Sequence, residues 1–385
     1  MRAVNATAGA LTLAAAWAVA GSAGAGALDR TGQSVGVIFE AGRYVELSFS
    51  TVSPEVSGRQ IRPFGIPPGP IAPEGERSGD MLEDYQAFAL AFRDDLTDRL
   101  SYAIIFDDPF GADTAYPGGR NYFAAGSTAD VQSRALTALL RYKFTDRIAV
   151  HGGLRYQSFS AEAELPFLFD YQANGRQDEG FGLVVGASYE IPEIALRVAL
   201  TYASEISHDN PTTESITVPT PFGPFTNLRE TTTEVETPQS VNLDFQTGLN
   251  ESTLLFGGVR WVDWSDFDIT PALYAELTGT SLLSYPDDIW SYTLGVGRKL
   301  TDKFSMAATI GYESQTGGFR TNLGPTDGQR SIGLAGTYTE GAVSVTAGLR
   351  YIDLGEADTA AGGDEVAEFD GGDAVAFGLR LGYRF

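Results

Sequence analysis

The C-terminal segment of the chain alternates strictly between apolar residues and small or charged ones. The apolar residues stand at every second position: Val375, Phe377, Leu379, Leu381, Tyr383 and Phe385. Successive side chains of a β-strand point to opposite faces, so this pattern gives one apolar face and one face of different character. The segment therefore predicts a final strand that separates two environments.

The same alternation recurs along the chain after residue 43. Residues 135–144 alternate, a tight turn follows at Thr145-Asp146-Arg147, and residues 148–156 alternate again. Aromatic residues stand at the ends of these segments, where a membrane barrel carries its interfacial girdles. A soluble sandwich would also alternate, but it would not gather aromatic residues at its strand ends. The opposite positions are rich in Gly, Ser and Thr, which suits a barrel interior.

Counting these segments predicts fourteen strands. They are expected near residues 43–52, 84–94, 99–107, 133–144, 147–158, 179–191, 194–204, 239–248, 252–263, 289–300, 303–314, 329–339, 342–353 and 373–385. Long loops are expected near residues 53–83, 108–132, 159–178, 205–238, 264–288, 315–328 and 354–372, with short turns between the other strands. An even strand number with alternating short and long connections is typical of bacterial outer-membrane barrels. We predict an all-β fold, a 14-stranded antiparallel transmembrane β-barrel over residues 44–385.

The composition excludes several classes of function. The formal net charge is −24, whereas binding of nucleic acid requires basic patches. The chain has no Cys, which removes disulfides and thiolate metal sites. Beyond the first 25 residues no apolar run reaches the roughly 18 residues of a membrane helix. We therefore expect no nucleic-acid partner, no metal and no cofactor.

The N-terminus has the pattern of a secretory signal peptide. Arg2 supplies the positive charge, residues 11–20 are apolar, and Ala23-Gly24-Ala25 offers small residues for cleavage. We predict a signal peptide over residues 1–25. Residues 26–43 then precede the first strand and contain the apolar stretch QSVGVIF. An unattached apolar stretch would be a liability in the periplasm, so we expect it inside the barrel; the alternative is an extension of the first strand.

Six further stretches carry a family signature. They are residues 28–34 (LDRTGQS), 44–49 (YVELSF), 108–111 (DPFG), 238–240 (PQS), 261–265 (WVDWS) and 290–295 (WSYTLG). In this order they resemble the FadL-type family of outer-membrane transporters for long-chain fatty acids and aromatic hydrocarbons. The resemblance spans essentially the whole mature chain and agrees with the strand count.

The resemblance implies a mechanism. The N-terminal segment would fold into the barrel as a hatch, with the hatch residues Gln33, Val35, Val37, Ile38 and Phe39. Cargo would be captured on extracellular loops, pass into the lumen, and leave sideways into the membrane at a distorted strand, without an energy source. One departure is that the segment over residues 26–43 is shorter than in better-known members and lacks an Asn-Pro-Ala box near its end.

Two predicted extracellular loops are unusually apolar, and exposed apolar loop tips usually mark a binding surface. The first loop contains Leu165, Phe167, Leu168 and Phe169, and the second contains Phe222 and Phe225. We expect these residues to form the initial capture surface for a hydrophobic cargo. The alternative is that the two loops pack on each other as a lid without a ligand.

Five arginines fall on the lumen side by parity: Arg141, Arg155, Arg197, Arg350 and Arg380. A carboxylate headgroup can bind Arg through two hydrogen bonds. Arg155 and Arg350 lie toward the extracellular half and are the candidates for this role; the alternative is that all five pair with lumen acids such as Asp244 and Glu313. Asp108 and Pro109 are the candidates for lateral exit, because Pro cannot donate to a strand ladder. An ordinary turn at the end of the strand explains these two residues equally well.

The sequence thus predicts a passive uptake channel in the outer membrane of a diderm bacterium, with long-chain fatty acids as the favoured cargo. The alternatives are a diffusion porin for small polar solutes and an outer-membrane lipid hydrolase, although neither His151 nor His208 belongs to a recognisable catalytic set. Expected partners are the hydrophobic cargo, outer-membrane lipid and lipopolysaccharide, and the insertion machinery that recognises a terminal aromatic residue. We expect a monomer.

Overall fold

The computed structural model describes residues 28–67, 69, 71–361 and 363–385. The predicted signal peptide over residues 1–25 lies outside these described residues and stays a prediction. Within them, no helix is long and apolar enough to cross a membrane.

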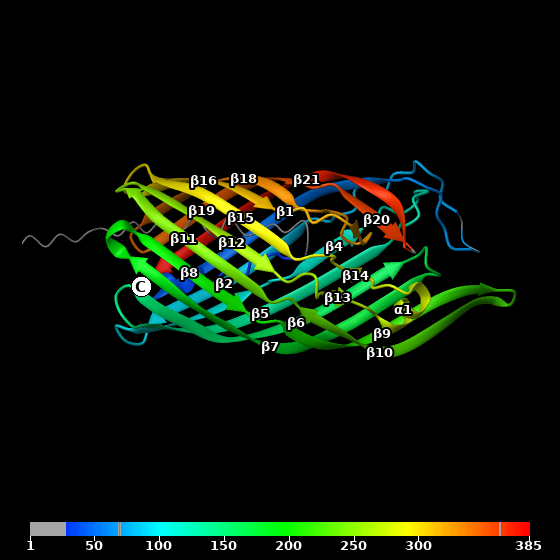
Figure 1. The fold of residues 1–385 in the computed structure, drawn as a ribbon, viewed down its shortest axis with the longest axis horizontal. Coiled ribbons are helices and arrows are strands. Elements are labelled where there is room, and N and C mark those ends of the chain that lie inside the picture. The colour runs from blue at the N-terminus through cyan, green and yellow to red at the C-terminus, as the bar shows by residue number, and fades with distance from the viewer. Residues whose placement is uncertain (1–27, 68, 70, 362) are drawn as a thin grey trace, which may run out of the picture.

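A closed ring of antiparallel strands forms the body of the molecule (Figure 1). Within the described residues the ring has fourteen strands. In order around the ring they are β1 (Tyr44–Gln60), β2 (Tyr85–Asp95), β3 (Leu100–Asp107), β5 (Thr128–Lys143), β6 (Ile148–Leu165), β7 (Tyr171–Ile191), β8 (Leu196–Ala203), β11 (Ser240–Asn250), β12 (Thr253–Val262), β15 (Ile289–Lys299), β16 (Phe304–Glu313), β18 (Gln329–Glu340), β19 (Val343–Leu354) and β21 (Asp364–Arg384). The last strand pairs with the first, for example Leu381 with Leu47, and this closure confirms the predicted fold class.

The period-two pattern places the apolar residues on the outside. On β5, Leu136 and Leu140 are exposed, whereas Ala135 and Leu139 face the interior and are buried. Aromatic residues gather near the short turns, where the rings of Tyr142 and Phe144 lie 5.1 Å apart. The exposed apolar band is therefore the surface that meets lipid.

Several strands continue beyond the apolar band, and this corrects the predicted loops. The predicted loop over residues 159–178 is reduced to a turn at residues 166–170, because β6 and β7 both extend to it. The predicted loop over residues 205–238 is a hairpin of β9 (Ile206–Thr220) and β10 (Gly223–Thr237). Above the lipid both faces of a strand can be polar, so alternation no longer reveals it; Arg176, Gln177 and Glu179 of β7 are all exposed.

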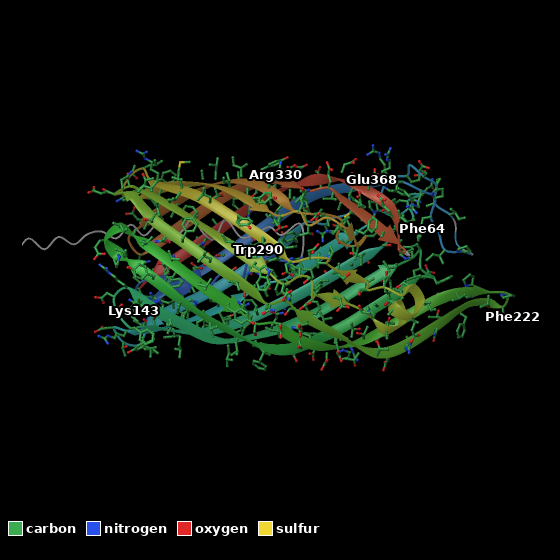
Figure 2. All side chains as sticks on the ribbon, viewed as in Figure 1. Phe64, Lys143, Phe222, Trp290, Arg330 and Glu368 are labelled. Carbon is green, nitrogen blue, oxygen red and sulfur yellow. The ribbon has the colours of Figure 1, made fainter. Side chains whose placement is uncertain are left out.

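The β9–β10 hairpin projects from the extracellular end. It joins the barrel wall where residues 172–175 of β7 pair with residues 212–215 of β9. Farther out Pro219 and Pro224 stand opposite each other, and Phe222 marks the tip (Figure 2).

Short elements lie at the extracellular end of the barrel. They are β4 (Gly111–Ala115), β13 (Asp268–Ile269), α1 (Ala272–Thr278), β14 (Leu283–Ser284), β17 (Phe319–Arg320) and β20 (Ala357–Ala361). The predicted loops over residues 108–132, 264–288, 315–328 and 354–372 contain these elements. A buried cluster around Trp264, Phe267 and Tyr285 packs against lumen-facing Phe110 and Phe159, so the upper barrel has a solid core.

We predict that a cation in the middle of the apolar band destabilises the barrel. Val185 lies on the exposed face of β7, between the aromatic residues Phe181 and Tyr189. Val185→Arg should lower the free energy of unfolding by about 2–4 kcal/mol, because the guanidinium would sit in hydrocarbon. Urea titration of the protein folded in lipid vesicles measures the change.

Gln177→Arg is the matched control, because Gln177 is exposed on the same strand above the band. Equal destabilisation by the two variants would contradict the placement of the membrane.

Candidate substrate pathway

The segment before β1 lies inside the barrel. Residues Gly36–Phe39 form a short 3-10 helix, η2, and Val35, Val37 and Ile38 are buried against lumen-facing residues of the wall. The ring of Phe39 lies between two guanidinium groups, with Arg197 4.6 Å and Arg141 5.1 Å from its centroid. The segment is thus not an extension of the first strand, which begins at Tyr44.

Polar contacts hold this segment to one side of the wall. Nε of Arg260 on β12 donates to Asp29 at 2.6 Å, and Ser240 on β11 donates to the side-chain oxygen of Gln33 at 2.8 Å. Gln33 has a φ of 53°, in the left-handed region, so its contacts fix a backbone shape that most residues avoid. The charge of Asp29 is therefore compensated inside the lumen.

Other contacts hold the segment to the opposite side, at the end of β3. Thr31 donates to Asp107 at 2.7 Å, and the backbone N–H of Arg30 donates to the carbonyl of Pro109 at 2.8 Å. The guanidinium of Arg30 pairs with Asp113. The N-terminal segment therefore spans the lumen from β11 and β12 to the bend at Asp108-Pro109.

The barrel wall is interrupted at this bend. The ladder between β2 and β3 stops at the pair Leu90–Phe106, and contact resumes only at the bridge between Leu82 and Thr114. In between, the N–H of Phe88 reaches the side chain of Asp108 at 3.4 Å. Both β3 and β4 pair with β5, so the chain does not turn back here but continues after a kink.

A cavity of about 150 Å³ lies beside the interruption. Its walls include the buried Ala87, the exposed Phe49 and Phe88, and Val37 and Phe39 of the N-terminal segment. We name it the wall cavity. Lumen-facing and lipid-facing residues both line it, so it lies within the wall beside the interruption.

The largest of the cavities described here, about 530 Å³, lies at the extracellular end. We name it the vestibule. Loops from several strand pairs form it, with the aromatic residues Phe64, Tyr116, Phe167, Tyr274, Tyr285 and Phe319 in its walls. Burial raises the pKa values of the Tyr116 and Tyr285 hydroxyls, so both stay neutral. Among its lining residues that the structure describes, Arg320 alone is charged.

Two smaller cavities lie below the vestibule. The first, which we name the junction cavity, shares Tyr285 and Leu323 with the vestibule and Arg30 with the wall cavity. The second, the side cavity, is apolar and shares Leu282 and Leu323 with the vestibule. Leu323 therefore borders three cavities at once and separates them.

The structure brings together only part of the predicted capture surface. Leu165, Phe167 and Leu168 line the vestibule, and Phe169 packs beside them against a buried cluster. Phe222 and Phe225 lie away from the vestibule, 100% and 62% exposed. Apolar composition did not distinguish a vestibule wall from the tip of a projecting hairpin.

Comparisons with known proteins agree with this architecture. Residues 41–385 match the profile of a family described as outer membrane protein transport protein (OMPP1/FadL/TodX). The chain belongs to this family. Its members are transport channels of the outer membrane, and the chain is accordingly an outer-membrane, multi-pass β-barrel. No curated protein matches it.

Solved structures of FadL-type proteins show the same fold. A FadL homologue from Pseudomonas aeruginosa superposes with a TM-score of 0.72 at 15% identity, covering 97% of this chain and 98% of that chain. The toluene transporter TodX from Pseudomonas putida gives 0.65 at 12% identity, covering 94% and 95%. The toluene transporter TbuX from Ralstonia pickettii gives 0.60 at 14% identity, covering 90% of each chain.

The predicted headgroup residues of this FadL-type chain lie in the wall. Arg155 is buried on β6 and donates to Thr137 at 2.9 Å. Arg350 is buried on β19 and donates to Ser331 at 2.7 Å. Neither is among the residues that line the vestibule, the junction cavity, the side cavity or the wall cavity.

Sequence reasoning missed Arg320, Leu323 and Tyr285. All three lie in predicted loops, where no periodicity shows which side chains point inward. The one local signal is composition: the stretch GGFRTNLGP over residues 317–325 combines a lone cation with two apolar residues among turn formers. That signal cannot reveal which cavity the residues border.

We predict that Asp29 closes the lumen to ions through its pair with Arg260. Asp29→Asn removes a charge-assisted hydrogen bond, a loss of about 1.5–3 kcal/mol. The N-terminal segment should then leave its place roughly ten- to a hundredfold more often. Planar-bilayer recordings should show correspondingly more frequent current steps.

The control is Asp302→Asn, which breaks the exposed pair between Asp302 and Lys299 at a short turn without touching the segment. Current traces of the Asp29 variant that match those of the parent protein would show that this pair does not hold the segment.

Proposed function

We propose that the protein is a passive uptake channel for hydrophobic compounds, with long-chain fatty acids as its favoured cargo. The observation that carries this proposal is the series of cavities that share residues. It runs from the vestibule past Leu323 to the junction cavity, past Arg30 to the wall cavity, and ends at the interrupted wall.

Each step suits a hydrophobic molecule. The aromatic vestibule lets cargo leave water early, which releases the free energy of apolar burial. The wall cavity opens beside Phe49 and Phe88, which are exposed on the lipid-facing surface. Cargo leaving there enters hydrocarbon without crossing water, so no energy source is needed.

The shape and charge of the route favour a long chain with an acidic head. A series of small neighbouring cavities fits an extended, flexible chain better than a compact ring. Among the described residues that line the vestibule, Arg320 alone is charged, so an acidic head meets a cation at the entrance; the wall cavity carries three arginines and four carboxylates. In this proposal the N-terminal segment acts as the hatch, and Asp108 and Pro109 mark the exit.

The remaining partners follow from the same proposal. The aromatic-flanked outer band would contact lipid and lipopolysaccharide. Tyr383 and Phe385 are exposed at the end of β21, with ring centroids 4.8 Å apart, where insertion machinery could bind them. Transport needs only one barrel, so we propose that the protein acts as a monomer.

We predict that a bulky residue at Ala87 blocks the route. Ala87 is buried and lines the wall cavity. Ala87→Trp should lower the rate of labelled oleate uptake at least tenfold in cells that lack their own transporter, while oleate binding to the purified protein persists in the vestibule. Leu90→Trp is the control, because Leu90 is on the same strand and faces lipid.

Equal uptake by the Ala87 and Leu90 variants would contradict the lateral route. Competition by toluene against labelled oleate would measure the preference between acids and neutral aromatics. A large, steady ion current through the parent protein would instead favour a porin.

A further inference from the structure

One loop controls the vestibule floor. The connection between β16 and β18 carries β17 and places Leu323 between the vestibule, the junction cavity and the side cavity. We name residues 316–327 of this connection the latch loop. The vestibule and the junction cavity share Leu323 and Tyr285, so a movement of this loop would change the boundary between the two cavities.

A single carboxylate, that of Asp327, joins the two ends of the latch loop through hydrogen bonds. Asp327 accepts the backbone N–H of Thr316 at 3.0 Å and that of Gly317 at 2.7 Å. The same carboxylate pairs with Arg320. Loss of the Arg320 contact, or its replacement by a contact with another anion, would therefore weaken the connection between the loop ends. The two backbone hydrogen bonds to Asp327 would remain.

Further contacts join the latch loop to the vestibule wall. Thr114 donates to the carbonyl of Leu323 at 2.9 Å, and the Tyr116 hydroxyl donates to the carbonyl of Asn322 at 2.5 Å. The pair β17–β20 adds a parallel strand contact between Phe319 and Asp358. These contacts define the closed position of Leu323.

Arg320 is buried yet incompletely satisfied. Its side chain is 1% exposed. Nη2 donates to Asp327 and to Thr316, whereas Nε and Nη1 have no hydrogen-bond partner among the described residues. A buried guanidinium with unmet donors is costly, and an added anion would relieve the cost. The hydroxyl of the neighbouring Thr321, which also lines the vestibule, is unpaired as well.

We propose that Arg320 is the binding residue for the anionic headgroup of the cargo, and that this binding releases the latch loop. The headgroup's carboxylate takes the guanidinium in competition with Asp327, and Leu323 then leaves the junction. This inference rests on the proposed function and names a residue and a step within it.

The geometry couples binding to opening. Nε and Nη1 have almost no accessible surface, so a carboxylate reaches them only when the latch loop moves. A ligand shifts an equilibrium by its difference in affinity for the two states. The carboxylate therefore favours the open loop, whereas a neutral hydrocarbon of the same length gains nothing from Arg320.

The first experiment compares oleate with oleyl alcohol, which have the same chain but different heads, on the purified full-length protein. Arg320→Met should weaken oleate binding about tenfold or more, because two charge-assisted hydrogen bonds are lost, and should leave oleyl alcohol within about twofold. Arg62→Met is the matched control, because Arg62 is a partly exposed arginine whose recorded partner is Asp364 and which does not line the vestibule.

A second variant gives the opposite sign, which misfolding cannot mimic. Asp327→Asn leaves an amide oxygen for the two backbone N–H groups but removes the competing charge. It should raise oleate affinity and speed oleate uptake several-fold. Equal loss of both ligands in Arg320→Met, or weaker oleate binding in Asp327→Asn, would overturn the proposal and make Arg320 a structural residue.

Movement of the latch loop is tested by locking it. The chain has no Cys, so Phe319→Cys with Asp358→Cys introduces the sole thiol pair, at paired positions of β17 and β20. Under oxidising conditions oleate uptake should stop, and dithiothreitol should restore it. Undiminished uptake by the oxidised protein would show that transport does not require movement of the latch loop. If the parent protein takes up neither ligand, the proposed function itself fails, which is a different outcome from unequal effects at Arg320.

Discussion

The bilayer leaves no water to satisfy backbone N–H and C=O groups, so every strand in it needs two paired neighbours. The chain meets this demand by closing the sheet between β1 and β21. An interruption lies between β2 and the β3–β4 kink, where side chains and the N-terminal segment take the place of the ladder. Closure makes the fold stable in lipid, and the proposed side exit depends on this interruption.

The same segment links the kink to the far wall. Arg30 contacts Pro109 and Asp113 on one side, while Asp29 and Gln33 contact β11 and β12 on the other. A few polar contacts therefore connect the kink with the far wall through one segment. Two of these contacts are ion pairs with little exposure to solvent, and together the four contacts give the segment a defined position.

The membrane part of the fold could be predicted because lipid imposes a strict period on the sequence. The strands of the β5–β6 pair and the closing strand were all visible in alternation. The extracellular part could not, because the buried face of β9 is largely polar, with His208, Asn210 and Glu214, and the outer half of β10 is exposed on both faces. Neither strand therefore shows an apolar period. For the same reason Phe222 and Leu165 looked alike in sequence, although one is at a hairpin tip and the other lines the vestibule. Arg320 and Leu323 gain their importance from loop packing, which no local pattern encodes.

The prolines of the projecting hairpin limit association between neighbouring barrels in the membrane. Pro219 and Pro224 face each other across β9 and β10 and have no N–H to offer a new strand. Exposed strand edges otherwise recruit edges of other molecules and grow into aggregates. The hairpin thus extends above the cell surface with phenylalanines at its end. Its prolines disfavour strand pairing with the hairpin of an adjacent barrel.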